Sequence, residues 1–110
     1  MNRALIALAV TCALAFPWSV HARGNADSGK NKSQACGACH GPEGNKPTGP
    51  DFPIIAGQYA DYLRKALSDY KSGARANPIM KGFAAPLSRQ DIDDIAAYFA
   101  SQTSPLQTHR

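Results

Sequence analysis

The chain has 110 residues, of which 44% are hydrophobic and 18% charged, with a formal net charge of +4. This length predicts a single domain, and the scattered basic residues form no dense patch of the kind that binds nucleic acid. Of the three cysteines, Cys12 lies in a segment that we expect to be removed. Cys36 and Cys39 alone remain, which excludes a framework of several disulfides.

The N-terminal residues have the pattern of a secretory signal peptide. Arg3 precedes an uncharged apolar stretch, 4–16, and the small residues of 20–22 suit a cleavage site. The stretch is shorter than the roughly 20 residues that a membrane-spanning helix needs. We therefore expect a signal peptide over 1–22, a single domain over 23–110 without a transmembrane segment, and a periplasmic location.

The first expected helix covers 26–35, with Asp27 or Ser28 as its N-cap. Residues 41–57 are rich in glycine and proline, which predicts a long loop without helix or strand. Loops of this length in compact domains are usually functional or disordered. Its apolar end indicates that it packs onto another part of the molecule, through Phe52, Ile54 and Ile55.

The clearest helix is predicted over 58–72, with Lys71 and Gly73 at its C-terminal end. Apolar residues recur there at helical spacing and share one face. They are Tyr59, Tyr62, Leu63, Ala66, Leu67 and Tyr70. The following residues, 73–87, contain glycine and proline and are expected to be a loop.

A second clear helix is predicted over 89–102, with Ser88 as its N-cap and Asp91 completing a capping box. The acidic residues of its first turns suit the helix dipole. They are Asp91, Asp93 and Asp94. The buried stripe is expected to be Ile92, Ile95, Ala96 and Phe99.

These elements predict an all-α fold with three main helices joined by long loops. No alternating apolar pattern of useful length indicates a strand. Helices of this length bury little apolar surface by themselves, and a domain of fewer than about 90 residues commonly depends on a metal, disulfides or a cofactor. The expected core is therefore incomplete without a bulky apolar cofactor.

The segment ACGACHG, 35–41, carries the chemistry that could supply this cofactor. Cys36, Cys39 and His40 could form a redox dithiol, part of a zinc site or a haem attachment site. A thioredoxin-like dithiol requires a preceding strand and a βαβ unit, which the sequence does not predict. Structural zinc requires a second pair of ligands. The C-x-x-C-H spacing is the attachment signature of c-type haem, which we favour over the other two.

Four stretches beyond this motif carry a family resemblance. They are GKNKSQACGACHGPEG, PIIAGQYADYL, YKSGARANPIM and LSRQDIDDIAAYFAS. From Gly29 to Gln102 the chain resembles a small class I c-type cytochrome of the bacterial periplasmic kind, similar to one domain of the dihaem cytochromes. The resemblance implies the cytochrome c fold, in which three main helices and long loops wrap around one covalently bound haem c.

The resemblance also implies the iron ligands. Cys36 and Cys39 would form the thioethers and His40 would be the proximal ligand. Met80 would be the second axial ligand, since it stands where the family places its methionine. Its alternative role is that of a methionine filling the core. Relatives often carry a further methionine where this chain has Phe83.

Other residues are assigned by the same resemblance. The Pro53 carbonyl would accept the proton of His40 Nδ1, although Pro53 could also be a plain loop residue. Ile55, Tyr59 and Tyr62 would pack in the haem pocket or in the core. Gly29 would allow Tyr98 or Phe99 to approach closely where the first and last helices cross.

These expectations describe an electron carrier and not an enzyme. Its partners would be redox proteins with acidic docking surfaces, meeting Lys46 and Lys81 beside an exposed haem edge, and we expect a monomer. One alternative is the cytochrome subunit of a larger dehydrogenase or oxidase. Another is a haem peroxidase or sensor, which requires an open sixth position. His109 could in principle replace Met80, but it lies in a polar tail.

Overall fold

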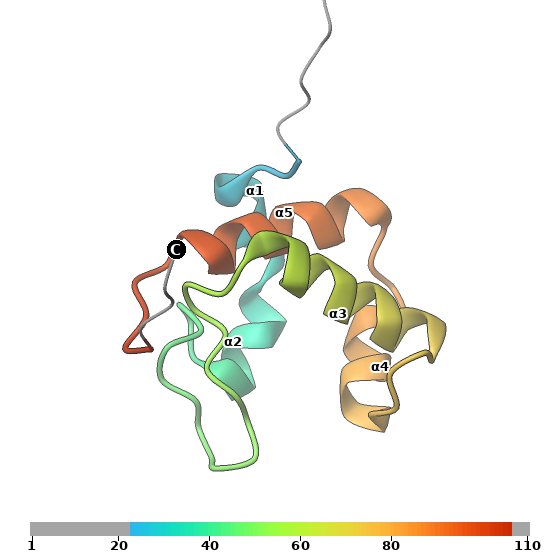
Figure 1. The fold of residues 1–110 in the computed structure, drawn as a ribbon, viewed down its shortest axis with the longest axis horizontal. Helices are drawn as coiled ribbons and strands as arrows, with labels where there is room; N and C mark the ends of the chain where they lie inside the picture. The colour runs from blue at the N-terminus through green and yellow to red at the C-terminus, as the bar shows by residue number, and fades with distance from the viewer. Residues whose placement is uncertain (1–22, 107–110) are drawn as a thin grey trace, which may run out of the picture.

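The computed structural model describes residues 23–106 and contains five helices and no strands in that part of the chain (Figure 1). This confirms the predicted all-α class. No helix among the described residues is both long and apolar enough to cross a membrane. The helices are α1 (Ala26–Lys32), α2 (Gln34–His40), α3 (Ala60–Ser72), α4 (Pro78–Ala84) and α5 (Arg89–Ser101). The predicted signal peptide, Cys12 and His109 lie outside the described residues.

The single helix predicted over 26–35 is in fact two helices, because the backbone leaves the helical conformation at Ser33 (φ −91°, ψ 6°). Ser33 is buried and its hydroxyl donates to the carbonyl of Lys30. The N-cap is Asn25, whose side chain accepts from the Ser28 amide at 2.8 Å, and not Asp27 or Ser28. The break gives the C-x-x-C-H segment a helix of its own.

The two long helices match their predictions to within two residues. Gly73 caps α3 in the left-handed conformation (φ 87°), which glycine adopts without steric cost. Ser88 caps α5 and forms the predicted capping box with Asp91. The predicted stripe on α5 is buried and includes Ile95 and Phe99, each 2% exposed.

The prediction of a continuous loop over 73–87 was wrong, since α4 lies within it. Asn77 is the N-cap, and its side-chain oxygen accepts from the amides of Ile79 and Met80 at 3.0 Å each. Pro78 occupies the first helical turn, where its missing N–H costs nothing and its fixed φ favours the helix. The proline therefore starts this helix instead of breaking it.

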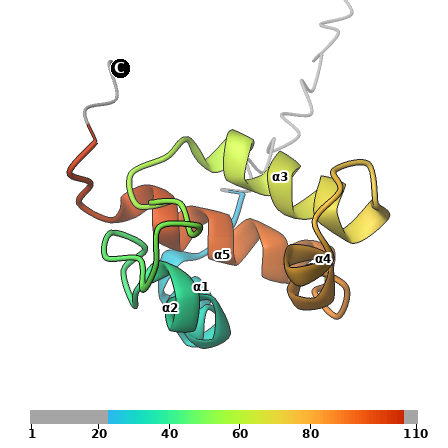
Figure 2. The ribbon, with the colours of Figure 1, turned by 90° about the horizontal axis from the view of Figure 1, so that it is seen from below.

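The helix α5 is the centre of the fold, with α1 on one side and α3 on the other (Figure 2). The first contact leaves no room for a side chain at Gly29. A Cβ atom there would lie 2.0 Å from the backbone oxygen of Asp94 and 2.8 Å from Tyr98 Cβ. This confirms the predicted close approach of Tyr98 at the crossing of the first and last helices.

Asp94 fixes the same crossing through polar contacts. Its side chain is 4% exposed and accepts from the Asn25 amide at 2.8 Å, Lys32 Nζ at 2.7 Å and Gln90 Nε2 at 2.8 Å. Only Asp91 of the three acidic residues lies in the first turn of α5. Asp94 lies one turn further on, where its carboxylate joins α5 to α1.

The loop between α2 and α3 is folded onto the C-terminal half of α5. Tyr98 donates its hydroxyl to the Pro42 carbonyl at 2.9 Å, and the Gly57 amide donates to the Phe99 carbonyl at 2.9 Å. At Gly44 (φ 74°) a Cβ atom would come within 2.8 Å of Phe99. These contacts place the loop against the core formed by Leu63, Ile95, Ala96, Tyr98 and Phe99.

Candidate functional site

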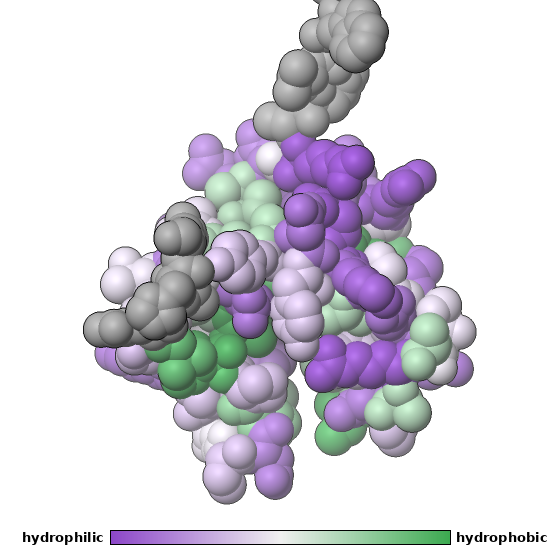
Figure 3. Space-filling view, viewed as in Figure 1, coloured by the Kyte–Doolittle hydropathy of each residue, from purple (hydrophilic) through white to green (hydrophobic). Residues whose placement is uncertain are grey.

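A cavity of about 360 Å³ lies between the helices, a volume typical of small-molecule and cofactor sites. In the space-filling view the molecule is hollowed between one lobe that contains α2 and another that contains α4 (Figure 3). The apolar lining comes from the loop between α2 and α3 and from all four helices α2 to α5. It includes Leu63, Ala66, Leu67, Ile95, Ala96 and Phe99.

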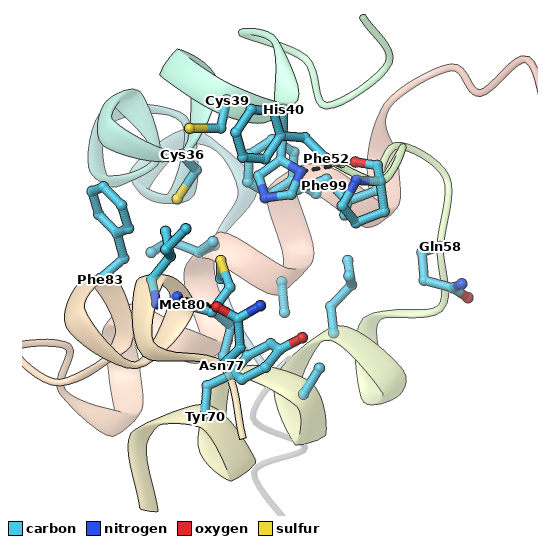
Figure 4. A pocket seen from close by; sticks show the side chains of 18 of the residues that line it. Cys36, Cys39, His40, Phe52, Gln58, Tyr70, Asn77, Met80, Phe83 and Phe99 are labelled. Atoms are coloured by element: carbon cyan, nitrogen blue, oxygen red, sulfur yellow. Dashed lines mark hydrogen bonds between the residues drawn. The ribbon is translucent and has the colours of Figure 1, made fainter. Parts of the chain in front are cut away.

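The helix α2 brings both cysteines to one wall of this cavity. Cys36 and Cys39 are three residues apart, so they share a face of the helix, and their sulfur atoms border the cavity (Figure 4). Both thiols are free and half-buried. Burial raises the pKa of the Cys36 thiol, and the nearby Cys39 raises it further. Two thiols are therefore available side by side for covalent attachment.

His40 is 7% exposed and its ring orientation is fixed by one hydrogen bond. Its Nδ1 lies 2.8 Å from the carbonyl oxygen of Pro53, the contact that the sequence analysis predicts. A carbonyl oxygen can only accept, so Nδ1 carries the proton and Nε2 keeps a free lone pair. The imidazole also meets Phe52 edge to face, with ring centroids 6.4 Å apart. Nε2 is thus available as a metal ligand.

Met80 lies in the first turn of α4, where the Asn77 cap holds its amide. It is half-buried and lines the cavity. Figure 4 shows the Met80 side chain on the wall opposite His40, with the two side chains directed towards each other across the cavity. An imidazole nitrogen and a thioether sulfur therefore face the same space from opposite sides.

The donor set fits a covalently bound haem better than the alternatives. Two neighbouring thiols, an imidazole and an opposed thioether surround a cavity with an apolar lining, which suits a porphyrin attached through two thioethers. Residues 23–106 contain no group of three or more His, Cys, Asp or Glu that could hold a bare metal ion. Nor does that range contain the strand that a thioredoxin-like dithiol requires.

The remaining predicted site residues are only partly brought together. Pro53 and Ile55 line the cavity, as does Tyr62. Tyr59 does not border the cavity, and about half of it is exposed, as is about half of Tyr62. Tyr59 is the N-cap of α3, with an extended backbone, and thus stands just before the first helical turn that the prediction included it in.

Several cavity residues are absent from the sequence prediction. Tyr70 belongs to the apolar face predicted for 58–72, but it was not predicted as a residue of the site. Arg75 and Asn77 come from the segment between α3 and α4, and their positions depend on how that segment turns. Phe52, Gln58 and Phe83 complete this group.

Comparisons with known proteins agree with this geometry. The family model described as cytochrome c matches residues 26–103. Cytochrome c4 of Pseudomonas aeruginosa is 48% identical over 102 residues, which cover 93% of this chain and 49% of that protein. A protein of Stutzerimonas stutzeri named thiosulfate dehydrogenase electron acceptor is 42% identical over 73 residues, covering 66% of this chain and 34% of that protein.

A solved structure shows the same fold. The crystal structure of reduced recombinant cytochrome c4 from Pseudomonas stutzeri superposes with a TM-score of 0.70 and 44% identity, covering 76% of this chain and 48% of that chain. The chain thus spans about half the length of the cytochrome c4 proteins that it matches. The family match and the structural likeness together show that this chain belongs to the cytochrome c family of class I c-type cytochromes.

Proposed function

We propose that this chain is a periplasmic electron-transfer protein that carries one electron on a single covalently attached haem c. The observation that carries the proposal is the pair of opposed donors, His40 and Met80, across a cavity whose wall presents Cys36 and Cys39. When bound, the haem would supply one-electron chemistry between its ferrous and ferric states.

The residues of the chain have distinct tasks in this proposal. Cys36 and Cys39 attach the cofactor and fix it against α2. The Pro53 carbonyl holds the His40 ring in one tautomer and makes Nε2 more basic. Asn77 holds the first turn of α4, which positions Met80. If His40 and Met80 both hold the haem iron, the protein would leave no coordination position open to a substrate.

The apolar lining determines the electronic environment of the site. Apolar side chains of α3 and α5 line the cavity, and around a bound haem their low polarity would disfavour the additional positive charge of the ferric state. A thioether ligand opposite an imidazole acts in the same direction, since it also raises the reduction potential. Both features favour a carrier that accepts an electron readily.

Partner proteins would meet the rim of the cavity. Lys46 on the loop and Lys81 on α4 are both exposed, and we propose that they steer a partner with an acidic docking surface. The name of the Stutzerimonas stutzeri relative, an electron acceptor of thiosulfate dehydrogenase, supports a role beside a larger enzyme. The second candidate is accordingly a cytochrome subunit of a dehydrogenase complex, which co-purification with another chain would identify.

The test is an optical redox titration of the haem-loaded protein, combined with carbon monoxide binding to the ferrous form. A carrier ligated by His40 and Met80 would titrate as a one-electron couple and would not bind carbon monoxide readily. Rapid carbon monoxide binding would mean that the sixth position is open. That result would contradict the carrier and favour a peroxidase or sensor.

A further inference from the structure

The polar side chains of the cavity wall gather at two places, apart from the proposed cofactor ligands. Asp51 and Gln58 lie on the side of the loop between α2 and α3. The second group lies along α3 and the segment that joins it to α4. It consists of Tyr62, Tyr70, Arg75 and Asn77. Within residues 23–106, Arg75 is the only lysine or arginine in the lining.

The local structure holds Arg75 at this position. After Gly73 turns the chain, the Arg75 amide donates to the Asp69 carbonyl at 3.1 Å. The guanidinium lies over the ring of Tyr70, with Cζ 4.8 Å from the centroid, and Nη1 is 3.5 Å from the Tyr62 hydroxyl. A cation stacked on an aromatic ring in this way loses side-chain freedom before any ligand binds.

Among residues 23–106, no carboxylate forms an ion pair with Arg75; Asp69 attracts its charge from a distance but is itself paired with Lys65. The ion pairs within residues 23–106 use Lys32, Arg64 and Lys65 as their cations. Arg75 keeps most of its five N–H donors for another acceptor, because within the described part of the chain its guanidinium donates one hydrogen bond, to Tyr62, and otherwise stacks on Tyr70. A planar guanidinium of this kind matches a carboxylate in both shape and charge.

Asn77 supplies a second donor beside Arg75. Its side-chain oxygen is occupied by the amides of Ile79 and Met80, so the orientation of the amide group is fixed. Figure 4 shows this amide next to Met80 and Tyr70 on the cavity wall. The Nδ2 group donates only and is not used by the cap, so it can meet an acceptor in the cavity.

We propose that Arg75, oriented by Tyr70 and Tyr62, binds a carboxylate of the haem, with Asn77 as the second donor. The inference rests on the proposed function. A haem has two vinyl groups, to which Cys36 and Cys39 attach, and it also has two carboxylate side chains that need a cation or water. Asp51 would repel a carboxylate at the other polar group, whereas Arg75 attracts it. Arg75 is thus a positioning residue for the cofactor.

The experiment compares the haem-loaded wild type with Arg75→Gln, Arg75→Lys and the control Arg89→Gln, which removes an exposed arginine at the start of α5 outside the cavity. Two quantities are measured: the reduction potential, and the carboxylate bending band of the resonance Raman spectrum, which responds to hydrogen bonding at the haem carboxylates. We expect Arg75→Gln to move the band and to lower the potential, because an unpaired negative charge stabilises ferric iron. Arg75→Lys should lie between, and Arg89→Gln should change neither.

Further variants separate the possible failures. Should Arg75→Gln not fold, Tyr70→Leu removes the ring beneath the guanidinium but keeps the charge, and it should shift the band in the same direction by a smaller amount. A low-spin wild type whose band and potential are the same in Arg75→Gln and Arg89→Gln would overturn this inference alone. A wild type without attached haem would overturn the proposed function as well.

Discussion

The crossing of α1 and α5 and the cavity between α2 and α4 are built in opposite ways. At the crossing, the chain fills all the space by itself: Gly29 leaves no room for a Cβ atom, and Asp94 has three hydrogen-bond donors around it. At the cavity, the side chains of four elements point into a space that they do not fill. The difference indicates that the polypeptide completes its own packing at the crossing and leaves space at the cavity for the haem that the proposed function requires.

The largest effect is expected when the haem can no longer be attached in the cavity. Cys36→Ser combined with Cys39→Ser removes both attachment points, so the purified protein should lack the mass of a bound haem. Without the haem the apolar lining of the cavity would face water, and we expect no cooperative thermal unfolding transition. Mass spectrometry and circular dichroism measure both outcomes. A colourless variant that still unfolds cooperatively would show that the polypeptide completes its own core.

The next largest effect is expected when a side chain is added at the crossing of α1 and α5. Gly29→Ala places a Cβ atom against the backbone oxygen of Asp94 and should lower the free energy of unfolding by about 3 kcal/mol. Gly82→Ala is the matched control, since Gly82 is also helical but has nothing within 4 Å of its Cβ position. That control should be neutral or slightly stabilising, by up to ~1 kcal/mol. Equal urea-denaturation midpoints for the two variants would contradict the claim that the crossing has no room for a side chain at Gly29.

A smaller effect is expected when the polar contacts of Asp94 at the same crossing are removed. Asp94→Asn keeps the shape of the side chain but removes its charge and one of its two acceptor oxygens. It should cost about 2 kcal/mol, because Lys32 and the Asn25 amide use different oxygens of Asp94 and only one of these remains an acceptor. The control is Asp69→Asn, which removes the partner of the exposed Lys65 on α3. A surface pair of this kind contributes about 0.5 kcal/mol or less. Similar losses in urea denaturation would mean that the Asp94 contacts are ordinary surface contacts.

The same carboxylates predict how stability depends on pH. The hydrogen bond from Lys32 lowers the pKa of Asp94, and it lowers the pKa of Asp91 to about 2. Because these pKa values lie below the unfolded value of roughly 4, the contribution is present above that pH and is lost as the pH falls towards 2. Asp94→Asn should therefore lose less stability than the wild type over this interval. Parallel denaturation curves at each pH would contradict this link.

The smallest effect concerns the surfaces of the two regions. Lys46→Glu combined with Lys81→Glu should slow electron transfer to an acidic redox partner at low salt, several-fold, and the difference should fade as salt is added. Lys30→Glu, on the exposed side of α1 at the crossing, should have no such effect. Stopped-flow kinetics measures the rates. Equal slowing by Lys30→Glu would place the docking surface elsewhere or make the effect one of net charge.

The two regions also differ in how far the sequence predicts them. The long helices α3 and α5 follow from apolar spacing and from the caps at Gly73 and Ser88. The break at Ser33 has no glycine or proline to indicate it, and it depends on the packing of a buried serine. The helix α4 was missed because Pro78 suggests a break, although Asn77 before it gives the correct signal.

The candidate site shows the same division. Cys36, Cys39 and His40 are contiguous in one motif, so the sequence predicts them directly. Met80 and Pro53 follow from the family resemblance, and the structure lets each of them face His40 from a different element. Arg75 could not be predicted, because its place in the cavity depends on the turn after Gly73 and on the ring of Tyr70. The spacing of residues in the sequence therefore does not predict those site residues whose positions depend on contacts between distant segments of the chain.

The most direct test of the central claim is the visible spectrum of the oxidised, haem-loaded protein, compared with that of Met80→Ala. The account predicts a low-spin spectrum with the weak far-red band of ferric iron bound to a methionine sulfur, and the loss of that band in the variant. A high-spin wild type, or a far-red band that persists in Met80→Ala, would show that Met80 is not the second axial ligand.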